Sequence, residues 1–154
     1  MKKTLYCIVA FLGLLACGSP SAEIDTGTPD NIDPEMQGFI QLMNEHRQSV
    51  GCQALAWNPT LATMAQSHSQ DMSDQGYMDH VSPQGVTFQQ RIIGAHVPFS
   101  SAGENVAFGS STGDGVLQQW LNSSGHRQNI ENCTYNQQAV GKVGTYWTDV
   151  FIKN

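Results

Sequence analysis

The chain has 154 residues, of which 40% are hydrophobic, and its formal net charge is −6 at pH 7. An acidic chain without a cluster of lysine or arginine is a poor candidate for binding nucleic acid or an anionic lipid surface, so neither is an expected partner. The length corresponds to one domain with a sizeable core, which we expect to be monomeric.

The N-terminus has the pattern of a secretory signal peptide. Two lysines precede an apolar run, Leu5 to Leu15, that is too short to span a bilayer. The run ends in Leu14-Leu15-Ala16-Cys17, which resembles the bacterial lipobox, where the cysteine is acylated and becomes the first mature residue. We therefore predict a signal peptide over residues 1–16 and membrane attachment through lipid on Cys17. The alternative is ordinary signal-peptide cleavage near Ala16.

The segment that follows, residues 17–33, is polar and rich in turn-forming residues. We expect it to be a lipidated cysteine followed by a flexible tether, which leaves one globular domain over residues 34–154. Gly18 and Ser19 are not the acidic residues that often retain Gram-negative lipoproteins at the inner membrane. The predicted location is thus the cell envelope, with the outer membrane favoured in a Gram-negative host.

The four cysteines fit an exported protein. Cys7 leaves with the signal peptide and Cys17 takes the lipid, so Cys52 and Cys133 remain as one pair in an oxidising compartment. A bridge between them would close a loop of roughly eighty residues, worth about 4–5 kcal/mol in the chain-entropy account. Two unpaired buried thiols are the alternative.

Three helices are expected in the first half of the domain. The first begins after a capping Asp33 and ends before Gly51, and the second begins after Asn58 and ends before Gly76. A short third helix is expected over 87–93. Mostly apolar residues recur at helical spacing in the first two: Met36, Phe39, Ile40, Met43, Arg47 and Val50 in one, and Leu61, Ala62, Ala65, His68 and Met72 in the other.

The second half of the domain contains the expected strands. Residues 105–108 form a short candidate strand, and Asp114 is expected to cap a fourth helix. The segments 139–143 and 146–151 flank Gly144-Thr145, a two-residue turn suited to a tight hairpin. Helices followed by an antiparallel hairpin predict an α+β fold and not parallel βαβ units.

Short motifs occur along the domain in an order that resembles the bacterial branch of a known superfamily. They are Asn44-Glu45-His46-Arg47, Leu55-Ala56-Trp57-Asn58-Pro59-Thr60-Leu61, His68 with Asp71-Met72, Asp79-His80, Gly103-Glu104-Asn105-Val106-Ala107, Trp120-Leu121-Asn122-Ser123-Ser124-Gly125-His126-Arg127-Gln128-Asn129-Ile130, and Tyr146-Trp147-Thr148-Asp149-Val150-Phe151. The superfamily, CAP/SCP, is named after cysteine-rich secretory proteins, antigen 5 and pathogenesis-related proteins. The resemblance covers about residues 36–152. It implies an α-β-α sandwich with a small antiparallel sheet between helical layers, and a bridge at Cys52 and Cys133.

The resemblance also implies a cleft with two histidines and two acids. His80 and His126 match the two histidines, and Glu104 matches the first acid. The position implied for the second acid, five residues before the helix tryptophan, is Gly115, with Asp114 one residue upstream. The chain therefore departs from the full set of four.

Two imidazoles and one carboxylate are a sufficient set of protein ligands for Zn²⁺ with an open position for water. On this interpretation His80, Glu104 and His126 would bind zinc, and the metal would act as a Lewis acid on a bound water. Without a metal, the same side chains would orient a ligand through hydrogen bonds. A third interpretation is structural, with Glu104 pairing backbone donors and His126 holding the loop after the fourth helix.

Two functions follow from these interpretations. The first is a binding module outside the cytoplasm for a small or lipid-like ligand, since the family includes members implicated in binding sterols and other lipids. The alternative is a metal-dependent hydrolase, because protease activity has been suggested for some relatives. The missing second acid favours binding over enzymatic activity, since general acid–base catalysis needs it more than metal binding does.

Overall fold

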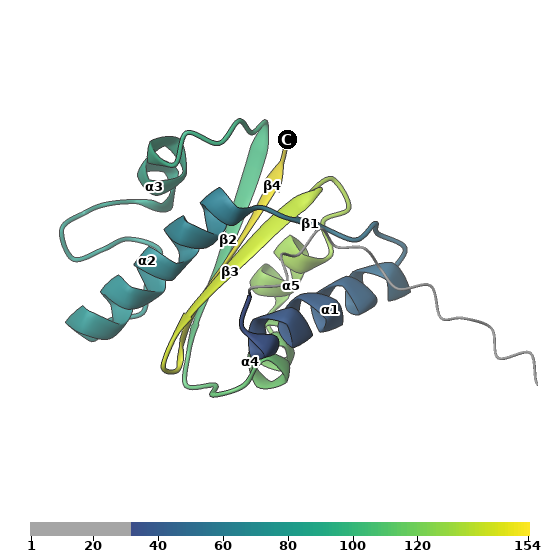
Figure 1. The fold of residues 1–154 in the computed structure, drawn as a ribbon, viewed down its shortest axis with the longest axis horizontal. Helices are drawn as coiled ribbons and strands as arrows, with labels where there is room; N and C mark the ends of the chain where they lie inside the picture. Colours follow the sequence, from purple (N-terminus) through teal and green to yellow (C-terminus); the bar gives the residue numbers. More distant parts are fainter. Residues whose placement is uncertain (1–31) are drawn as a thin grey trace, which may run out of the picture.

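The computed structural model describes residues 32–154, so the predicted signal peptide, Cys17 and most of the predicted tether lie outside the described residues. The described part of the chain contains five helices and four strands (Figure 1). In chain order these are α1 (Pro34–Ser49), β1 (Ala56–Trp57), α2 (Pro59–Gln75), α3 (Phe88–Gly94), β2 (Ser101–Phe108), α4 (Gly113–Leu121), α5 (Ser124–Ile130), β3 (Gln137–Val143) and β4 (Tyr146–Lys153).

The helix starts follow local capping signals. Asp33 accepts a hydrogen bond from the Glu35 amide at 2.8 Å, and Asn58 caps α2 in the same way. The prediction that Asp114 caps α4 is wrong: Thr112 is the cap, and Asp114 lies in the first turn. A carboxylate in the first turn still interacts favourably with the positive end of the helix dipole. α5 was not predicted from the sequence and lies where a loop was expected.

The strands form one sheet in the order β1-β3-β4-β2. β3, β4 and β2 are antiparallel neighbours, and the predicted hairpin is confirmed with Gly144 in the left-handed region at φ +59°. The expected sheet was wholly antiparallel, whereas the observed sheet is mixed because the two residues of β1 pair parallel to β3. β2 begins at Ser101 and is longer than the strand predicted at 105–108.

Helices cover both faces of the sheet, which confirms the α+β sandwich (Figure 1). α2 and α3 lie on one face, and α1, α4 and α5 lie on the other. The α2 layer approaches the sheet very closely at Gly141, where an added Cβ would lie 2.3 Å from the Gln66 nitrogen. Ser69 donates a hydrogen bond to the Gly141 carbonyl at 3.0 Å in the same contact. Only glycine permits this approach.

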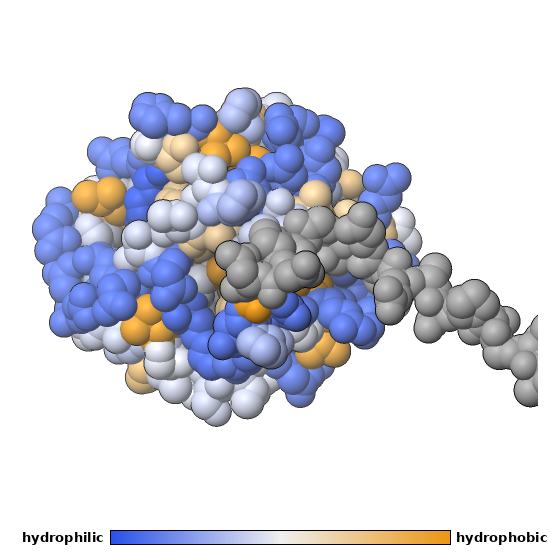
Figure 2. Space-filling view, in the orientation of Figure 1, coloured by the Kyte–Doolittle hydropathy of each residue, from blue (hydrophilic) through white to orange (hydrophobic). Residues whose placement is uncertain are grey.

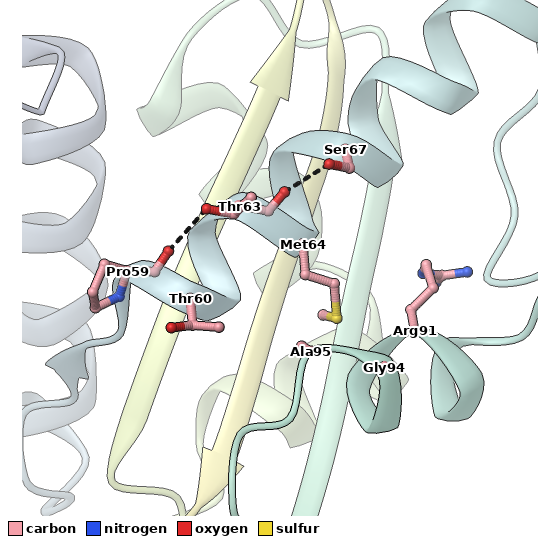
Figure 3. Close-up of a pocket in the computed structure, with 8 residues that line it drawn as sticks. All are labelled: Pro59, Thr60, Thr63, Met64, Ser67, Arg91, Gly94 and Ala95. Atoms are coloured by element: carbon pink, nitrogen blue, oxygen red, sulfur yellow. Dashed lines mark hydrogen bonds between the residues drawn. The ribbon is translucent and has the colours of Figure 1, made fainter.

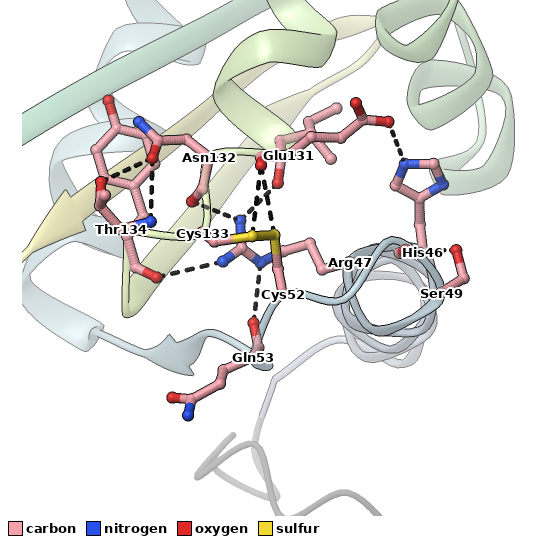
Figure 4. Close-up of a disulfide and its surroundings, with 11 residues drawn as sticks. His46, Arg47, Ser49, Cys52, Gln53, Glu131, Asn132, Cys133 and Thr134 are labelled. Atoms are coloured by element: carbon pink, nitrogen blue, oxygen red, sulfur yellow. Dashed lines mark hydrogen bonds and ion pairs between the residues drawn. A yellow bond between two sulfur atoms is a disulfide. The ribbon is translucent and has the colours of Figure 1, made fainter.

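The predicted disulfide between Cys52 and Cys133 is confirmed, with the two Cα atoms 4.8 Å apart (Figure 4). It joins the end of α1 to the segment after α5. The guanidinium of Arg47, which is fully buried, lies beside it and donates to backbone carbonyls on both sides of the joint. These carbonyls belong to Gln53, Ile130, Asn132 and Tyr135.

β2 is an edge strand, and side chains of α4 and α5 attach along its outer edge. Trp120 Nε1 donates to the Val106 carbonyl at 3.2 Å, and Asn129 Nδ2 donates to the Glu104 carbonyl at 3.2 Å. Gln119 Nε2 reaches the Phe108 carbonyl at 3.4 Å. These bonds hold α4 and α5 along β2, with Asn129 of α5 beside the middle of the strand.

The surface shown in Figure 2 is mostly hydrophilic, with hydrophobic side chains scattered over it. Three of the exposed hydrophobic residues, Met78, Val81 and Val86, belong to the connection between α2 and α3. Within residues 32–154, no helix combines the length and the hydropathy that a membrane span requires.

Candidate functional site

His80 and Glu104 are in direct contact. His80 lies in the connection between α2 and α3, and its Nδ1 is 2.8 Å from Oε1 of Glu104 on β2. The Glu104 side chain is 1% exposed, whereas that of His80 is 48% exposed. A buried carboxylate therefore supports an imidazole that reaches solvent.

Arg91 on α3 contacts both His80 and Glu104, and it was not identified from the sequence. Its Nη2 donates to both carboxylate oxygens of Glu104, at 2.9 and 2.8 Å. Its Nη1 donates to the carbonyls of His80 and Val86, at 3.1 and 3.2 Å. The guanidinium thus holds the carboxylate and the backbone of the histidine at the same time. The only available signal was that a buried carboxylate needs a cation, and basic residues are few in this chain.

His126 lies on α5. Asn105 Nδ2 donates to the His126 carbonyl at 3.1 Å, which ties this part of α5 to the residue next to Glu104. Burial, and then the positive charge of His80, lower the pKa of His126. Its Nδ1 is buried and has no hydrogen-bond partner within the described part of the chain. We refer to His80, Arg91, Glu104 and His126 together as the imidazole–acid cluster.

The loop that carries His80 is fixed by side chains beneath it. His68, a buried histidine on α2, bonds through Nε2 to the Asp79 carbonyl at 2.9 Å, and its pKa is lowered mainly by burial. The Asp79 carboxylate accepts from the Val81 amide at 2.9 Å. The Tyr77 hydroxyl donates to Asp71 of α2. These contacts therefore hold the loop around His80 in place.

The two histidines of the cluster differ in their affinity for a proton. The hydrogen bond to Glu104 raises the pKa of His80 above its ordinary value, against the opposing effect of burial. The pKa of His126 is lowered, as described above. As pH falls, His80 is therefore the first of the two to become a cation, and its Nε2–H then becomes a donor for an external acceptor.

Gly115, implied as the position of a second acid, lies in the first turn of α4, beside Ser110 and Thr112. An added Cβ at Gly115 would lie 2.5 Å from Ser110 Oγ and 2.9 Å from Thr112 Oγ1. Both neighbours follow the end of β2 at Phe108, and Glu104 lies four positions earlier in that strand. Four strand residues span about 13 Å. Whether a carboxylate at this position would complete the cluster stays a prediction.

The side chains suggested as zinc ligands do not fit that role as they are arranged. Both oxygens of Glu104 accept from Arg91, and one of them also contacts His80 Nδ1. Only imidazole nitrogens remain for a metal, and the guanidinium beside them is positively charged. In residues 32–154, no group of three or more His, Cys, Asp or Glu side chains is placed to hold a metal ion. We therefore derive no metal-dependent step.

A pocket of about 530 Å³ lies between α2 and α3, next to the cluster (Figure 3). The Met64 side chain points across it toward α3, and Arg91 lies at one side. The hydroxyls of Thr63 and Ser67 donate to carbonyls of their own helix, so they offer only acceptor positions to the pocket. The volume is in the range of small-molecule sites. Arg91 is shared between this pocket and the cluster.

Residues 40–151 match the Cysteine-rich secretory protein family, abbreviated CAP. Among curated proteins of Bacillus subtilis (strain 168), the chain is 36% identical over 129 residues to the uncharacterized protein YkwD, covering 82% of this chain and 50% of YkwD. It is 37% identical over 115 residues to the uncharacterized membrane protein YlbC, covering 75% of this chain and 33% of YlbC. The chain thus spans half or less of these relatives.

Solved structures show the same fold. An extracellular protein containing an SCP domain from Bacillus anthracis aligns with a TM-score of 0.75 and 38% identity, over 78% of this chain and 40% of that one. An outer surface protein from Borrelia burgdorferi aligns with a TM-score of 0.73 at 22% identity, over 80% and 96% of the two chains, and so supports the fold alone. The extent of the family match and the fold together establish that the chain belongs to the cysteine-rich secretory protein (CAP) family.

Proposed function

We propose that this protein is an exported, lipid-anchored binding module of the cell envelope for a small or lipid-like ligand. The supporting observation is the placement of a fixed polar group beside an apolar pocket. Glu104 and Arg91 hold His80 half-exposed, and Arg91 also lines the pocket between α2 and α3. A ligand could place an apolar part against Met64 and a polar acceptor near His80.

The surroundings of His80 are consistent with a ligand that has an apolar part. Met78, Val81 and Val86 are 50%, 41% and 42% exposed and flank His80 in the same loop. The buried Glu104 carboxylate is already paired with His80 and Arg91, which suits orientation of a ligand better than proton transfer. A general base must be free to accept a proton, whereas the Glu104 oxygens are engaged by Arg91.

Export and anchoring rest on the N-terminal sequence and on the relatives, which are described as extracellular, outer-surface or membrane proteins. The disulfide also fits an oxidising compartment. Substitution of Cys17 by serine should release the protein from membranes into the soluble fraction. Intact mass of the exported protein would show an unmodified N-terminus beyond Cys17 if the anchor does not exist.

Ligand binding can be tested with octanoate, which joins an apolar chain to a carboxylate, and with acetate as the carboxylate alone. We expect octanoate to shift the Met64 methyl and the His80 imidazole NMR signals, and acetate to leave Met64 unchanged. His80→Gln should weaken the response, while His96→Gln, an exposed histidine outside the cluster, should not. Millimolar octanoate without effect on either signal would contradict the proposal.

The alternative function, a metal-dependent hydrolase, rests on His80 and His126, because imidazoles are common zinc ligands and the charge of His80 acts on His126. It requires Glu104 to leave Arg91 or to remain outside the ligand set. Calorimetric titration with Zn²⁺ and the metal content of the purified protein test it directly. Turnover that disappears with a chelator and returns with zinc would favour the hydrolase over the binding module.

A further inference from the structure

A second pocket, of about 550 Å³, lies along α5 and the segment that follows it, and its volume is in the range of small-molecule sites. It shares no lining residue with the pocket between α2 and α3, and none of its lining residues belongs to the imidazole–acid cluster. The lining consists of polar side chains and one half of the disulfide: Ser124, Arg127, Gln128, Glu131, Asn132 and Cys133. Because no aliphatic or aromatic side chain lines it, the pocket is suited to a polar ligand and not to a lipid chain.

Most of the lining comes from one face of α5. Four lining residues are three or four positions apart and therefore share a helix face: Ser124, Arg127, Gln128 and Glu131. Other residues of α5 are turned toward the protein, since Ile130 is fully buried and Asn129 donates to β2. A polar helix face that points away from the core is ordinarily only solvated. Here the segment with Asn132 and Cys133 adds a wall, so the face lines a pocket.

The wall that follows α5 is held in place by covalent and polar contacts (Figure 4). Cys133 is bridged to Cys52, and the buried Arg47 donates to the Asn132 carbonyl at 3.1 Å. The Asn132 side chain is fixed as well, because its Oδ1 accepts from the Thr134 amide at 3.0 Å and from the Thr134 hydroxyl at 2.7 Å. A backbone amide can only donate, so the oxygen must face Thr134. The Asn132 Nδ2 group, which has no hydrogen-bond partner within residues 32–154, is therefore left for a ligand.

The pocket contains a cation, Arg127, that forms no ion pair within the described part of the chain. Glu131 is four positions further along α5, the spacing at which an ion pair could form. Its Oε1 instead contacts His46 Nε2 at 3.0 Å (Figure 4). The exposed Arg127 guanidinium donates to the Leu121 carbonyl at 3.4 Å, which is a long contact. Most of its five N–H donors are therefore available to an acceptor in the pocket.

We propose that this second pocket binds a sugar that carries a carboxylate, such as a hexuronic acid. The planar guanidinium of Arg127 matches a carboxylate through two parallel hydrogen bonds. The sugar hydroxyls can accept from the amide groups of Asn132 and Gln128 and donate to the Glu131 oxygen that does not contact His46. A simple carboxylate would use only the guanidinium, and a neutral sugar only the other groups. This site is separate from the one in the proposed function, so either can fail alone.

Two glycosides that differ only in a carboxylate replacing a hydroxymethyl group test the proposal in the full chain by nitrogen-15 NMR. Millimolar methyl glucuronide should shift the Arg127 Nε and the Asn132 side-chain amide signals, and added salt should weaken this response. Methyl glucoside should bind about tenfold more weakly, since it lacks the charged acceptor. Equal affinity for the two glycosides, equal shifts with acetate, or no shift with the glucuronide would each overturn the proposal.

Two variants test the assigned contacts. Arg127→Met should reduce the affinity for the glucuronide to that for the glucoside, whereas Lys153→Met, at an exposed cation outside the pocket, should not. Asn132→Asp keeps the oxygen that accepts from Thr134 but replaces the donor by a negative charge, so the glucuronide response should disappear. An unchanged Met64 methyl signal, from the pocket between α2 and α3, shows that each variant is folded. Folded Arg127→Met or Asn132→Asp that binds the glucuronide like the wild type would contradict the site.

Discussion

Removing the Arg91 guanidinium should destabilise the domain strongly, because the buried Glu104 carboxylate would lose its cationic partner. The Arg91 side chain is 11% exposed and that of Glu104 is 1% exposed, so the pair is largely buried. Breaking a buried ion pair by removing one partner costs about 3–5 kcal/mol. Glu104 would retain its contact with His80, so we expect Arg91→Met to cost about 3 kcal/mol, at the lower end of that range.

The measurement is urea unfolding at pH 7, followed by the fluorescence of the fully buried Trp120 and Trp147. The double variant Arg91→Met/Glu104→Gln removes the isolated charge and should recover most of the loss. The coupling free energy from the four proteins in this cycle should be about 2 kcal/mol. Arg91→Met also loses two bonds to backbone carbonyls, and the cycle separates that loss from the loss of the ion pair.

Arg127→Met is the matched control, since Arg127 is exposed and its contact with the Leu121 carbonyl is long, at 3.4 Å. Its effect should stay within about 0.5 kcal/mol. A loss below about 1 kcal/mol for Arg91→Met would mean that the pair behaves as an exposed ion pair. That result, or the absence of coupling to Glu104, would refute the view that Arg91 fixes the buried carboxylate.

Three further predictions concern the cluster and the fold. Glu104→Gln should lower the pKa of His80 in an NMR titration. Because folding raises the pKa of His80 above 6.5, protonated His80 stabilises the folded state fully below pH 6.5. This contribution to the free energy of unfolding is lost as pH rises through the pKa of the folded state. Gly141→Ala should cost at least about 2 kcal/mol in denaturant unfolding because its Cβ would overlap the α2 backbone, whereas Gly125→Ala, with open space around it, should be neutral or stabilising. Cys133→Ser should lower the melting temperature by about 10 °C or more, and equal melting of the oxidised, reduced and variant proteins would contradict this.

The features that could be predicted from the sequence depend on local signals. Asp33 and Asn58 cap α1 and α2 and so mark where these helices begin, and Gly144 marks the hairpin turn. α5 has no such signal, since only Ile130 of its seven residues is buried and Ser123 makes no side-chain cap. Short helices of this kind are held by tertiary contacts and not by propensity.

In the candidate site, too, some residues could be found from sequence motifs, whereas others depend on tertiary contacts. The motifs identified His80, Glu104 and His126, and the structure brings the first two into contact. Arg91 could not be found in this way, because its contact with Glu104 exists only when α3 lies over β2. The expected zinc-ligand role of Glu104 depended on the direction of its oxygens, which residue identity and spacing do not determine.

The attachments along β2 have a consequence for how the domain behaves among other proteins. An uncovered edge strand presents backbone groups that another extended chain can join, which is a route to aggregation and strand exchange. Here the carbonyls of Glu104, Val106 and Phe108 are already occupied by side chains of α4 and α5. An incoming strand would have to displace the Trp120 indole from the core before it could pair. The β2 edge of the sheet is therefore not a template for strand pairing, even at high protein concentration.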